Sequence, residues 1–424
     1  MTKFQFDSAR EAEAARAFLV TVAVGRERHF DAGEELTELV RSDNLEPVGL
    51  IQARRDKPDP ATYLGSGKIE EIKMLAKGAR ADCIVFDAAL SAAQQRNIAN
   101  VTELPVLDRT ELILEIFRRR AKSKEGRLQV ELARLEHLST RLVRGWTHLE
   151  RQRGGLGKTG GPGEKQIELD RRMIGARVKM LREQLKKLSR QRDTQRRSRL
   201  KGDTPTVSLV GYTNAGKSTL FNRLVREKAY AADQLFATLD TTARRCWVSD
   251  EQTVVLSDTV GFIRGLPHQL VEAFKSTLDE TVHADILLHV VDSASTVREE
   301  QMASVATVLK QIGADDIRQI VVYNKCDVSG LEPAVQRNAD GTVRSVTISA
   351  ATGAGLDLLR DVLAQEAQKV REENASVPRE LEFWEEERPA AKATMRLSRN
   401  SKRCSEAGRF LVPKGFSNPL RERW

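Results

Sequence analysis

The chain has 424 residues, of which 40% are hydrophobic, 5% aromatic and 30% charged, and its formal net charge at pH 7 is +9. This length allows two to four domains, each with a core of its own. No run approaches the roughly 18 apolar residues of a membrane helix and the first residues lack a signal-peptide core, so we expect a cytoplasmic protein without a transmembrane segment. The cysteines show neither disulfide nor metal-ligand spacing, which agrees with a reducing compartment.

Residues 1–112 alternate short apolar runs with helical patterns, which predicts a small α/β domain with a largely parallel sheet. The expected strands are 18–24, 48–52, 83–86 and 106–107, and the expected helices are 34–41, 69–77 and 92–101. The turn from Gly65 to Lys68 is not a second phosphate loop, because that pattern needs a glycine where Thr62 stands. A glycine turn that opens a helix is the better explanation, although a secondary nucleotide contact stays open.

Residues 113–203 combine a helical leucine pattern with an excess of basic charge. Apolar residues at helical spacing run from Leu128 to Leu142 and from Ile167 to Leu188, which predicts two long helices in an antiparallel hairpin. Between 117 and 201 the chain carries 26 Lys and Arg against 9 Asp and Glu, while the rest of it is net acidic. This asymmetry indicates a segment that binds a polyanion.

Six glycines between 154 and 163 form the predicted connection of the hairpin. Backbone that can approach closely, next to basic side chains and an aromatic ring, suits the phosphates and stacked bases of structured RNA. The alternative is a solvated flexible linker. The candidate RNA contacts are Arg144, Trp146, Arg151, Arg153 and Lys158.

Residues 204–370 are expected to form a nucleotide-binding domain with a doubly wound sheet, because they contain a phosphate-binding loop. The run 211–218 fits the pattern G-x-x-x-x-G-K-[ST] between an apolar run at 207–210 and a predicted helix at 219–228. Backbone N–H groups would face the polyphosphate, Lys217 would reach the β- and γ-phosphates, and the Ser218 hydroxyl would bind Mg²⁺. The candidate residues of this loop are Gly211, Tyr212, Thr213, Asn214, Ala215, Gly216, Lys217 and Ser218.

Three later segments, each after a predicted strand, indicate that the nucleotide carries guanine. Asp258 ends a strand where its carboxylate can hold the Mg²⁺ shell, and the Gly261 N–H can sense a γ-phosphate. Asp327 can accept both N1–H and N2–H of guanine, a pair that adenine does not offer, and the backbone after 348 can contact the base O6. The candidates are Asp258, Thr259, Val260, Gly261, Asn324, Lys325, Cys326, Asp327, Ser349, Ala350 and Ala351.

A threonine between the phosphate loop and Asp258 should bind Mg²⁺ only when a γ-phosphate is present. Thr238, Thr241 and Thr242 are the candidates, and spacing alone does not choose among them. The last segment, 371–424, is polar, and the sequence assigns it no role.

The motifs as a set resemble those of HflX, a family of ribosome-associated GTPases, over residues of about 30 to 365. The strings that carry the resemblance are PDPATYLGSGKIEEI, FDAALSAAQQRNI, RLVRGWTHLERQRGG, GYTNAGKST, DQLFATLD and DTVGFIRGLPHQLVEAFKSTLDE. The tail after about 370 does not resemble the usual C-terminal domain of the family.

The resemblance implies an N-terminal α/β domain, a helical hairpin and a GTPase domain with Mg²⁺ as cofactor. It implies that Thr238, in the string FATLD, is the switch threonine on Mg²⁺, and it adds four candidate neighbours: Phe236, Ala237, Leu239 and Asp240. The implied activity is GTP hydrolysis stimulated by the large ribosomal subunit and its RNA. The implied role is the splitting or rescue of stalled ribosomes under stress, and we expect a monomer.

Phe262 stands one residue after Gly261, where many GTPases carry a glutamine that orients the attacking water. We therefore expect slow intrinsic hydrolysis that the ribosome accelerates by completing the site, and the catalytic residue itself is not identified. The alternative is a nucleotide-gated RNA-binding module with incidental GTP or ATP hydrolysis, which large-subunit particles would stimulate little.

Overall fold

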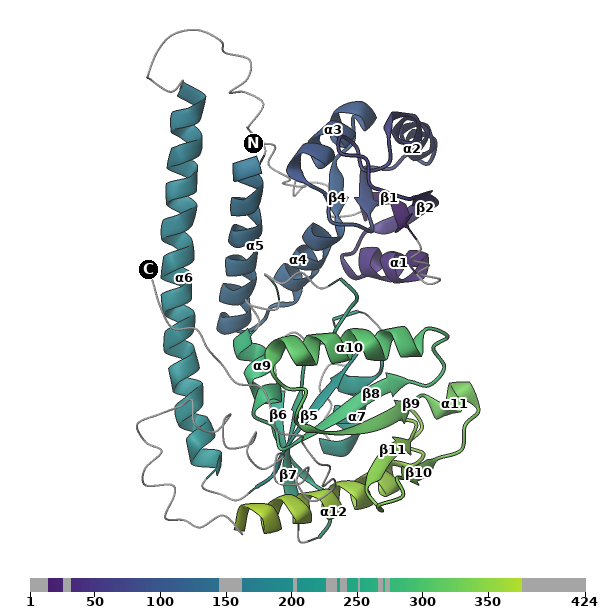
Figure 1. The fold of residues 1–424 in the computed structure, drawn as a ribbon, viewed down its shortest axis with the longest axis vertical. Coiled ribbons are helices and arrows are strands. Elements are labelled where there is room, and N and C mark those ends of the chain that lie inside the picture. Colours follow the sequence, from purple (N-terminus) through teal and green to yellow (C-terminus); the bar gives the residue numbers. More distant parts are fainter. Residues whose placement is uncertain are drawn as a thin grey trace, which may run out of the picture. The chain divides into compact units, whose positions relative to one another are not determined.

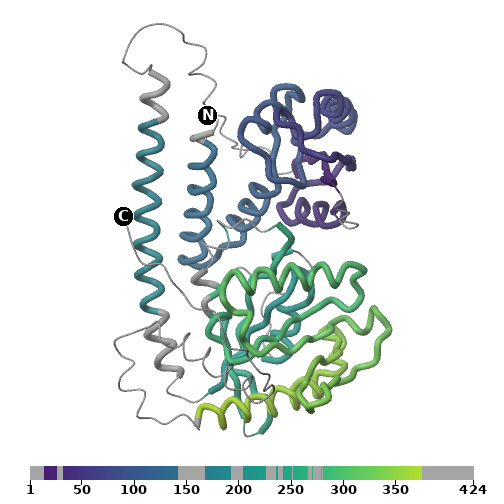
Figure 2. Tube along the Cα trace, in the orientation of Figure 1, coloured from purple at the N-terminus to yellow at the C-terminus, as the bar shows by residue number. Residues whose placement is uncertain are grey.

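The structure is a computed structural model, and it describes residues 14–25, 32–144, 162–200, 204–225, 235–236, 242–250, 252–265, 270 and 275–375 (Figure 2). The chain divides into one compact unit, Met1–Val370, and a second, Arg371–Trp424. Of the second unit only residues 371–375 are described, and they end the last helix. Within the described ranges, no helix is both long enough and apolar enough to cross a membrane.

The N-terminal part is a four-stranded parallel sheet in the order β2-β1-β3-β4 (Figure 1). The strands are β1 (Arg16–Val24), β2 (Glu46–Arg55), β3 (Cys83–Phe86) and β4 (Val106–Asp108). Four helices alternate with them: α1 (Ala32–Ser42), α2 (Ser66–Gly78), α3 (Ala92–Thr102) and α4 (Arg109–Arg120). The predicted mixed α/β character of this region is confirmed.

Both faces of the central strands β1 and β3 are buried, which explains why these two strands are almost continuously apolar. Phe18 and Ile84 pack with α2 and α3 in one buried cluster. Leu19 and Val85, one residue further along the same strands, pack with α1 and α4 in another. Side chains alternate between the two faces of a strand, so β1 and β3 each contribute to both clusters.

Two long helices follow, α5 (Lys124–Arg144) and α6 (Pro162–Leu200), and they lie side by side (Figure 1). Arg177 of α6 pairs with Glu131 of α5 at 2.6 Å, and Arg182 pairs with Glu136 at 2.7 Å. Of the predicted glycine-rich connection, 154–163, residues 154–161 lie outside the described residues and Pro162 and Gly163 begin α6, so the antiparallel hairpin stays a prediction.

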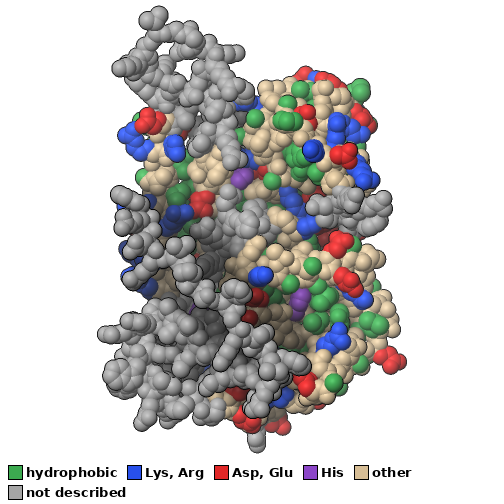
Figure 3. All heavy atoms as spheres, viewed as in Figure 1, with side chains coloured by type: hydrophobic (Ala, Val, Ile, Leu, Met, Phe, Trp, Pro, Cys, Tyr) green, Lys and Arg blue, Asp and Glu red, His purple; other side chains and the backbone are tan. Residues whose placement is uncertain are grey.

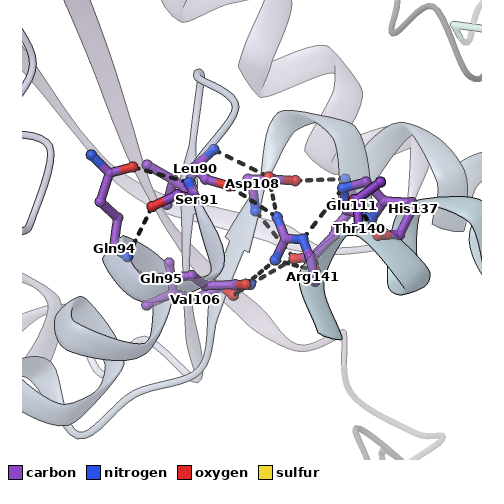
Figure 4. Close-up of polar contacts among 10 residues, drawn as sticks. All are labelled: Leu90, Ser91, Gln94, Gln95, Val106, Asp108, Glu111, His137, Thr140 and Arg141. Carbon is purple, nitrogen blue, oxygen red and sulfur yellow. Dashed lines mark hydrogen bonds and ion pairs between the residues drawn. The ribbon is translucent and has the colours of Figure 1, made fainter. Parts of the chain in front are cut away.

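Arg141 fixes the end of α5 to the N-terminal sheet (Figure 4). Its guanidinium donates hydrogen bonds to Asp108 and Gln95 and lies 2.8 Å from a carboxylate oxygen of Glu111. Asp108 is only 1% exposed and also caps α4, accepting the backbone N–H of Glu111 at 2.8 Å. A buried carboxylate needs such a cation, and the pairing joins α5 to the edge strand β4.

The C-terminal part of the first unit is a seven-stranded sheet in the order β10-β11-β9-β8-β5-β7-β6. Five strands run parallel to one another: β5 (Thr206–Gly211), β7 (Thr253–Asp258), β8 (Ile286–Asp292), β9 (Arg318–Asn324) and β11 (Val343–Thr347). The edge strands β6 (Thr242–Trp247) and β10 (Ala334–Arg337) are antiparallel. The sequence predicted neither edge strand.

Five described helices accompany this sheet (Figure 1). They are α7 (Lys217–Val225), α9 (Lys275–Val282), α10 (Arg298–Ile312), α11 (Cys326–Ser329) and α12 (Leu356–Ala375). The carboxyl ends of parallel strands meet at one edge of a sheet, and ligands bind there in open α/β folds. The four motifs predicted for nucleotide binding all follow such strand ends.

Candidate nucleotide-binding site

The loop between β5 and α7 has a backbone that its sequence explains. Gly216 has a φ of +90°, and a Cβ there would lie 2.2 Å from the amide nitrogen of Asn324. Only glycine tolerates both the conformation and the approach. The predicted phosphate loop therefore wraps closely against the end of β9.

Lys217 is buried, and its ammonium is held by backbone oxygens of the loop. Nζ donates to the carbonyl of Tyr212 at 2.7 Å and to that of Gly211 at 3.1 Å. Burial lowers the pKa of Lys217 to about 8, with the charge of Asp258 acting in the opposite direction. Removing a cation from water is costly unless an anion compensates, so this environment suits a phosphate.

Ser218 and Asp258 lie together at the start of α7 and the end of β7. The Ser218 hydroxyl donates to a carboxylate oxygen of Asp258 at 2.7 Å. A hydroxyl beside a carboxylate is the oxygen donor set that Mg²⁺ prefers when substrate phosphates complete its shell. The described residues contain no group of three or more His, Cys, Asp or Glu side chains placed to hold a metal, and a phosphate-bound Mg²⁺ needs none.

The segment after Asp258 is joined to the phosphate loop through its backbone. Thr213 donates its N–H to the carbonyl of Phe262 at 2.8 Å, and Phe262 donates to the carbonyl of Gly211 at 3.1 Å. A Cβ on Gly261 would lie 2.8 Å from Thr213 and 3.0 Å from the Lys217 ammonium. The candidate γ-phosphate sensor, Gly261, is thus brought next to the candidate phosphate lysine.

Asn324 connects the phosphate loop to the two loops predicted to hold the base. Its amide nitrogen donates to the carbonyl of Ala215 at 2.8 Å, and its amide oxygen accepts from the N–H of Ala350 at 2.9 Å. Lys325 follows with a φ of 65° and pairs with Asp292 of β8 at 2.7 Å. All these groups are at one edge of the sheet.

The remaining base-site candidates differ in exposure. Asp327 is exposed, as a carboxylate that must accept hydrogen bonds from a ligand should be, while Ser349 and Ala350 are buried and Ala351 is exposed. Cys326 is buried with its N–H bonded to the carbonyl of Ile348, and burial raises the pKa of its thiol. We therefore assign Cys326 a structural role, in which it connects the two base loops.

A polar cluster from the N-terminal sheet contacts the phosphate loop, and sequence reasoning missed it. The Tyr212 hydroxyl donates to Glu35 at 2.7 Å and accepts the N–H of Arg264 at 2.9 Å. The side chain of Arg264 pairs with Asp87 at 2.9 Å. The buried Arg109 pairs with both Glu35 and Asp87. Tyr212 and Glu35 are 177 residues apart, and no local pattern indicates such a contact.

Several candidates lie outside the described residues. These are Ala237, Thr238, Leu239, Asp240 and Thr241, together with Trp146, Arg151, Arg153 and Lys158. Arg144 is the last residue of α5, and Phe236 is buried with its ring 4.7 Å from that of Phe117. Thr242, the third candidate switch threonine, begins strand β6 opposite Asp258.

Three family descriptions match consecutive parts of the chain. "GTP-binding GTPase N-terminal" matches residues 31–118, "GTP-binding GTPase Middle Region" matches 120–199, and "50S ribosome-binding GTPase" matches 206–325.

Curated relatives match most of the chain. GTPase HflX of Escherichia coli (strain K12) is 49% identical over 82% of this chain and 82% of that protein. GTPase HflX of Caldanaerobacter subterraneus subsp. tengcongensis is 44% identical over 84% of this chain and 82% of that protein. A solved structure of a GTP-binding protein from the archaeon Sulfolobus solfataricus in complex with GDP aligns with 24% identity and a TM-score of 0.44, covering 84% of this chain and 99% of that one.

Proposed function

The chain belongs to the HflX family of GTPases, and we propose that it couples GTP binding and hydrolysis to binding of the large ribosomal subunit. The resemblance drawn from the sequence motifs is thereby confirmed. The main support for nucleotide binding is the side chain of Asn324. Its two hydrogen bonds, which we call the Asn324 bridge, join the phosphate loop to both base loops. The ribosomal part is supported by the match of 206–325 to a 50S ribosome-binding GTPase description.

We assign roles at the site from these contacts. Lys217 binds the β- and γ-phosphates, the N–H of Gly261 binds the γ-phosphate, and Asp327 accepts two hydrogen bonds from guanine. The backbone of Ser349–Ala351 contacts the base O6. The remaining candidate loop residues surround the phosphates and the ribose.

The Ser218 hydroxyl would ligate Mg²⁺ and Asp258 would hold its water shell, as their hydrogen bond supports. Thr238 would join the shell when the γ-phosphate is present. The ion supplies positive charge that offsets the charge developing on the transferred phosphoryl group.

Hydrolysis adds water to the γ-phosphorus and releases GDP and phosphate. Phe262, in the place of a water-orienting glutamine, is 1% exposed and lies in the core cluster with Ile263. A buried phenyl ring offers the water no hydrogen bond, so intrinsic hydrolysis is slow. The large subunit accelerates it by fixing the segments on either side of the γ-phosphate.

Helix α6 supports the RNA-binding part of the proposal. Its described residues 168–191 carry eight exposed basic side chains and three acidic ones. The basic ones are Arg171, Arg172, Arg177, Lys179, Arg182, Lys186, Lys187 and Arg190. Lys and Arg side chains are visible along the edge of the molecule where α6 lies (Figures 1 and 3). Such a stripe neutralises phosphates of a nucleic acid irrespective of sequence.

We further propose four segments for the chain and a role in the cell. Residues 1–112 form the N-terminal α/β domain, 113–203 the basic hairpin, 204–370 the GTPase domain and 371–424 a tail without assigned role. The hairpin loop, with Arg144, Trp146, Arg151, Arg153 and Lys158, contacts ribosomal RNA. The protein acts in the cytoplasm as a monomer and splits or rescues stalled ribosomes under stress.

The test is sedimentation of the protein with purified large subunits, in GDP or in a non-hydrolysable GTP analogue. We expect binding that is stronger with the analogue and that weakens as salt rises. Replacing Arg171, Lys179 and Lys186 by Gln should make the binding constant depend less steeply on salt. The slope of its logarithm against the logarithm of the salt concentration should fall by about one unit for each phosphate that the helix no longer neutralises. A control with Arg298, Lys310 and Arg344 changed to Gln removes the same charge from exposed positions of the GTPase domain.

The two triple variants separate local contact from overall charge. Equal weakening in both would mean that net charge alone matters and that α6 is no RNA-binding surface. Binding that is independent of the nucleotide would contradict the proposed coupling. It would favour the RNA-binding module with incidental hydrolysis.

A further inference from the structure

The side chain of Thr213 carries a polar group that the described fold does not use. Thr213 is 7% exposed, and among the described residues its hydroxyl oxygen is buried without a hydrogen-bond partner. A buried hydroxyl left unpaired costs stability, so most such groups have partners. Valine would fill the same space without this cost, and the hydroxyl therefore calls for an explanation.

The hydroxyl belongs to the part of the loop nearest the proposed γ-phosphate position. A Cβ on Gly261 would meet the Thr213 side chain at 2.8 Å and the Thr213 Cα at 2.9 Å, with the Lys217 ammonium 3.0 Å away. Thr213 and the Lys217 ammonium thus both lie next to Gly261, so Thr213 is close to the two groups to which we assign γ-phosphate contacts. This placement rests on the proposed function above.

Among the described residues that follow Asp258, neither Phe262 nor Thr259 can take the part of a water-orienting glutamine. Phe262 is fixed in the core, and both its backbone N–H and its carbonyl are bonded to the phosphate loop. The hydroxyl of Thr259 donates to the carbonyl of Leu209 at 2.6 Å, below the sheet edge. Among these residues, Thr213 alone has an uncommitted hydroxyl.

We propose that Thr213 is a catalytic residue whose hydroxyl orients the attacking water. A hydroxyl both accepts and donates, so it can accept a hydrogen bond from the water and donate one to a γ-phosphate oxygen. The water oxygen forms its bond to the γ-phosphorus while the bond from that phosphorus to the β–γ bridging oxygen breaks. One water proton remains on the released phosphate, the other passes to solvent, and Thr213 is unchanged.

The hydroxyl is buried in this structure, and the methyl group and Cα of the same residue lie close to Gly261. We expect the hydroxyl to reach the attacking water only when Gly261 has moved toward a bound γ-phosphate. Thr213 therefore acts only after GTP is bound, and its contribution appears in the hydrolysis rate and not in the affinity for GDP.

The experiment compares Thr213→Val, which keeps the shape and removes the hydroxyl, with Thr213→Ser, which keeps the hydroxyl. Single-turnover hydrolysis of bound GTP is measured together with GDP affinity and thermal unfolding. We expect Thr213→Val to hydrolyse GTP at least about tenfold more slowly, the effect of losing one hydrogen bond to the reacting water. Thr213→Ser should stay within about threefold of the wild type, since its hydroxyl is retained. GDP affinity should be unchanged in both.

Thr21→Val, which removes the hydroxyl of a β1 residue that is 5% exposed, controls for the loss of a hydroxyl from a buried residue. Thr213→Val that hydrolyses GTP at the wild-type rate with a raised melting temperature would overturn the proposal. So would equal losses of rate and of GDP affinity, because they would indicate a distorted loop. A wild-type protein that hydrolyses no GTP would instead contradict the proposed function itself.

Discussion

Replacing Asn324 by Ala would break the bridge between the phosphate loop and the base loops. The substitution removes two buried hydrogen bonds, of 2.8 Å to the carbonyl of Ala215 and of 2.9 Å from the N–H of Ala350. Each backbone group left unpaired in the interior costs about 1–3 kcal/mol, so we expect a loss of about 2–5 kcal/mol in the free energy of unfolding. GDP affinity should fall at least about tenfold, because the two loops lose their common anchor.

The assay is denaturant unfolding without nucleotide, since a bound ligand would stabilise the folded state by mass action. The matched control is Asn338→Ala, which removes an exposed hydrogen bond of 2.9 Å to Thr342 in a turn. We expect the control to change the free energy of unfolding by less than about 0.5 kcal/mol and to leave GDP affinity unchanged. If Asn324→Ala behaves like the control in both measurements, the bridge does not hold the site together.

Four further predictions follow from individual residues. Asp327→Asn should weaken GTP by about 2–4 kcal/mol and favour xanthosine triphosphate, whose extra carbonyl accepts the new N–H; unchanged preference in competition binding would refute the base assignment. Ser218→Ala should raise the Mg²⁺ concentration needed for GTP binding, and a magnesium titration identical to that of the wild type would remove this serine from the metal shell. Arg141→Met should destabilise the protein by about 3–5 kcal/mol, because it leaves a buried carboxylate unpaired. The control Arg118→Met, at a side chain that is 50% exposed, should cost less than about 1 kcal/mol. Similar losses for the two variants in urea unfolding would contradict the structural role of the cluster in Figure 4. Burial lowers the pKa of His289 from 6.5 to about 4. The unfolded chain therefore binds the proton at a higher pH than the folded protein, and the free energy of unfolding should fall as the pH drops from 6.5 toward 4, by about 3 kcal/mol at most. The variant His289→Leu should lack this part of the pH dependence, and an unchanged pH profile would show that another group causes it.

The phosphate loop and the guanine motifs can be proposed from the sequence because their chemistry is local. A run such as 211–218 contains in eight consecutive residues the glycines, lysine and serine that phosphate binding requires. The apolar runs at 83–86 and 207–210 likewise lie within strands β3 and β5, whose side chains are buried on both faces of the sheet. Local composition is sufficient for such elements.

Other parts of the site depend on contacts that no local pattern contains. Strand β6 has exposed arginines and only one fully buried side chain, Cys246, so its periodicity is too weak to predict an edge strand. The cluster of Glu35, Asp87 and Arg109 meets Tyr212 and Arg264 only because two sheets distant in sequence are brought together. The orphan hydroxyl of Thr213 is likewise visible only when its surroundings are known.

We propose that this chain hydrolyses GTP under the control of the large ribosomal subunit. The most direct test is the steady-state turnover of GTP and of ATP, each measured alone, with purified large subunits and with purified small subunits. We expect large subunits to raise GTP turnover at least about tenfold, equivalent to a barrier lower by about 1.4 kcal/mol, and to leave ATP turnover unchanged. Equal turnover with and without large subunits, or equal stimulation by both subunits, would contradict it.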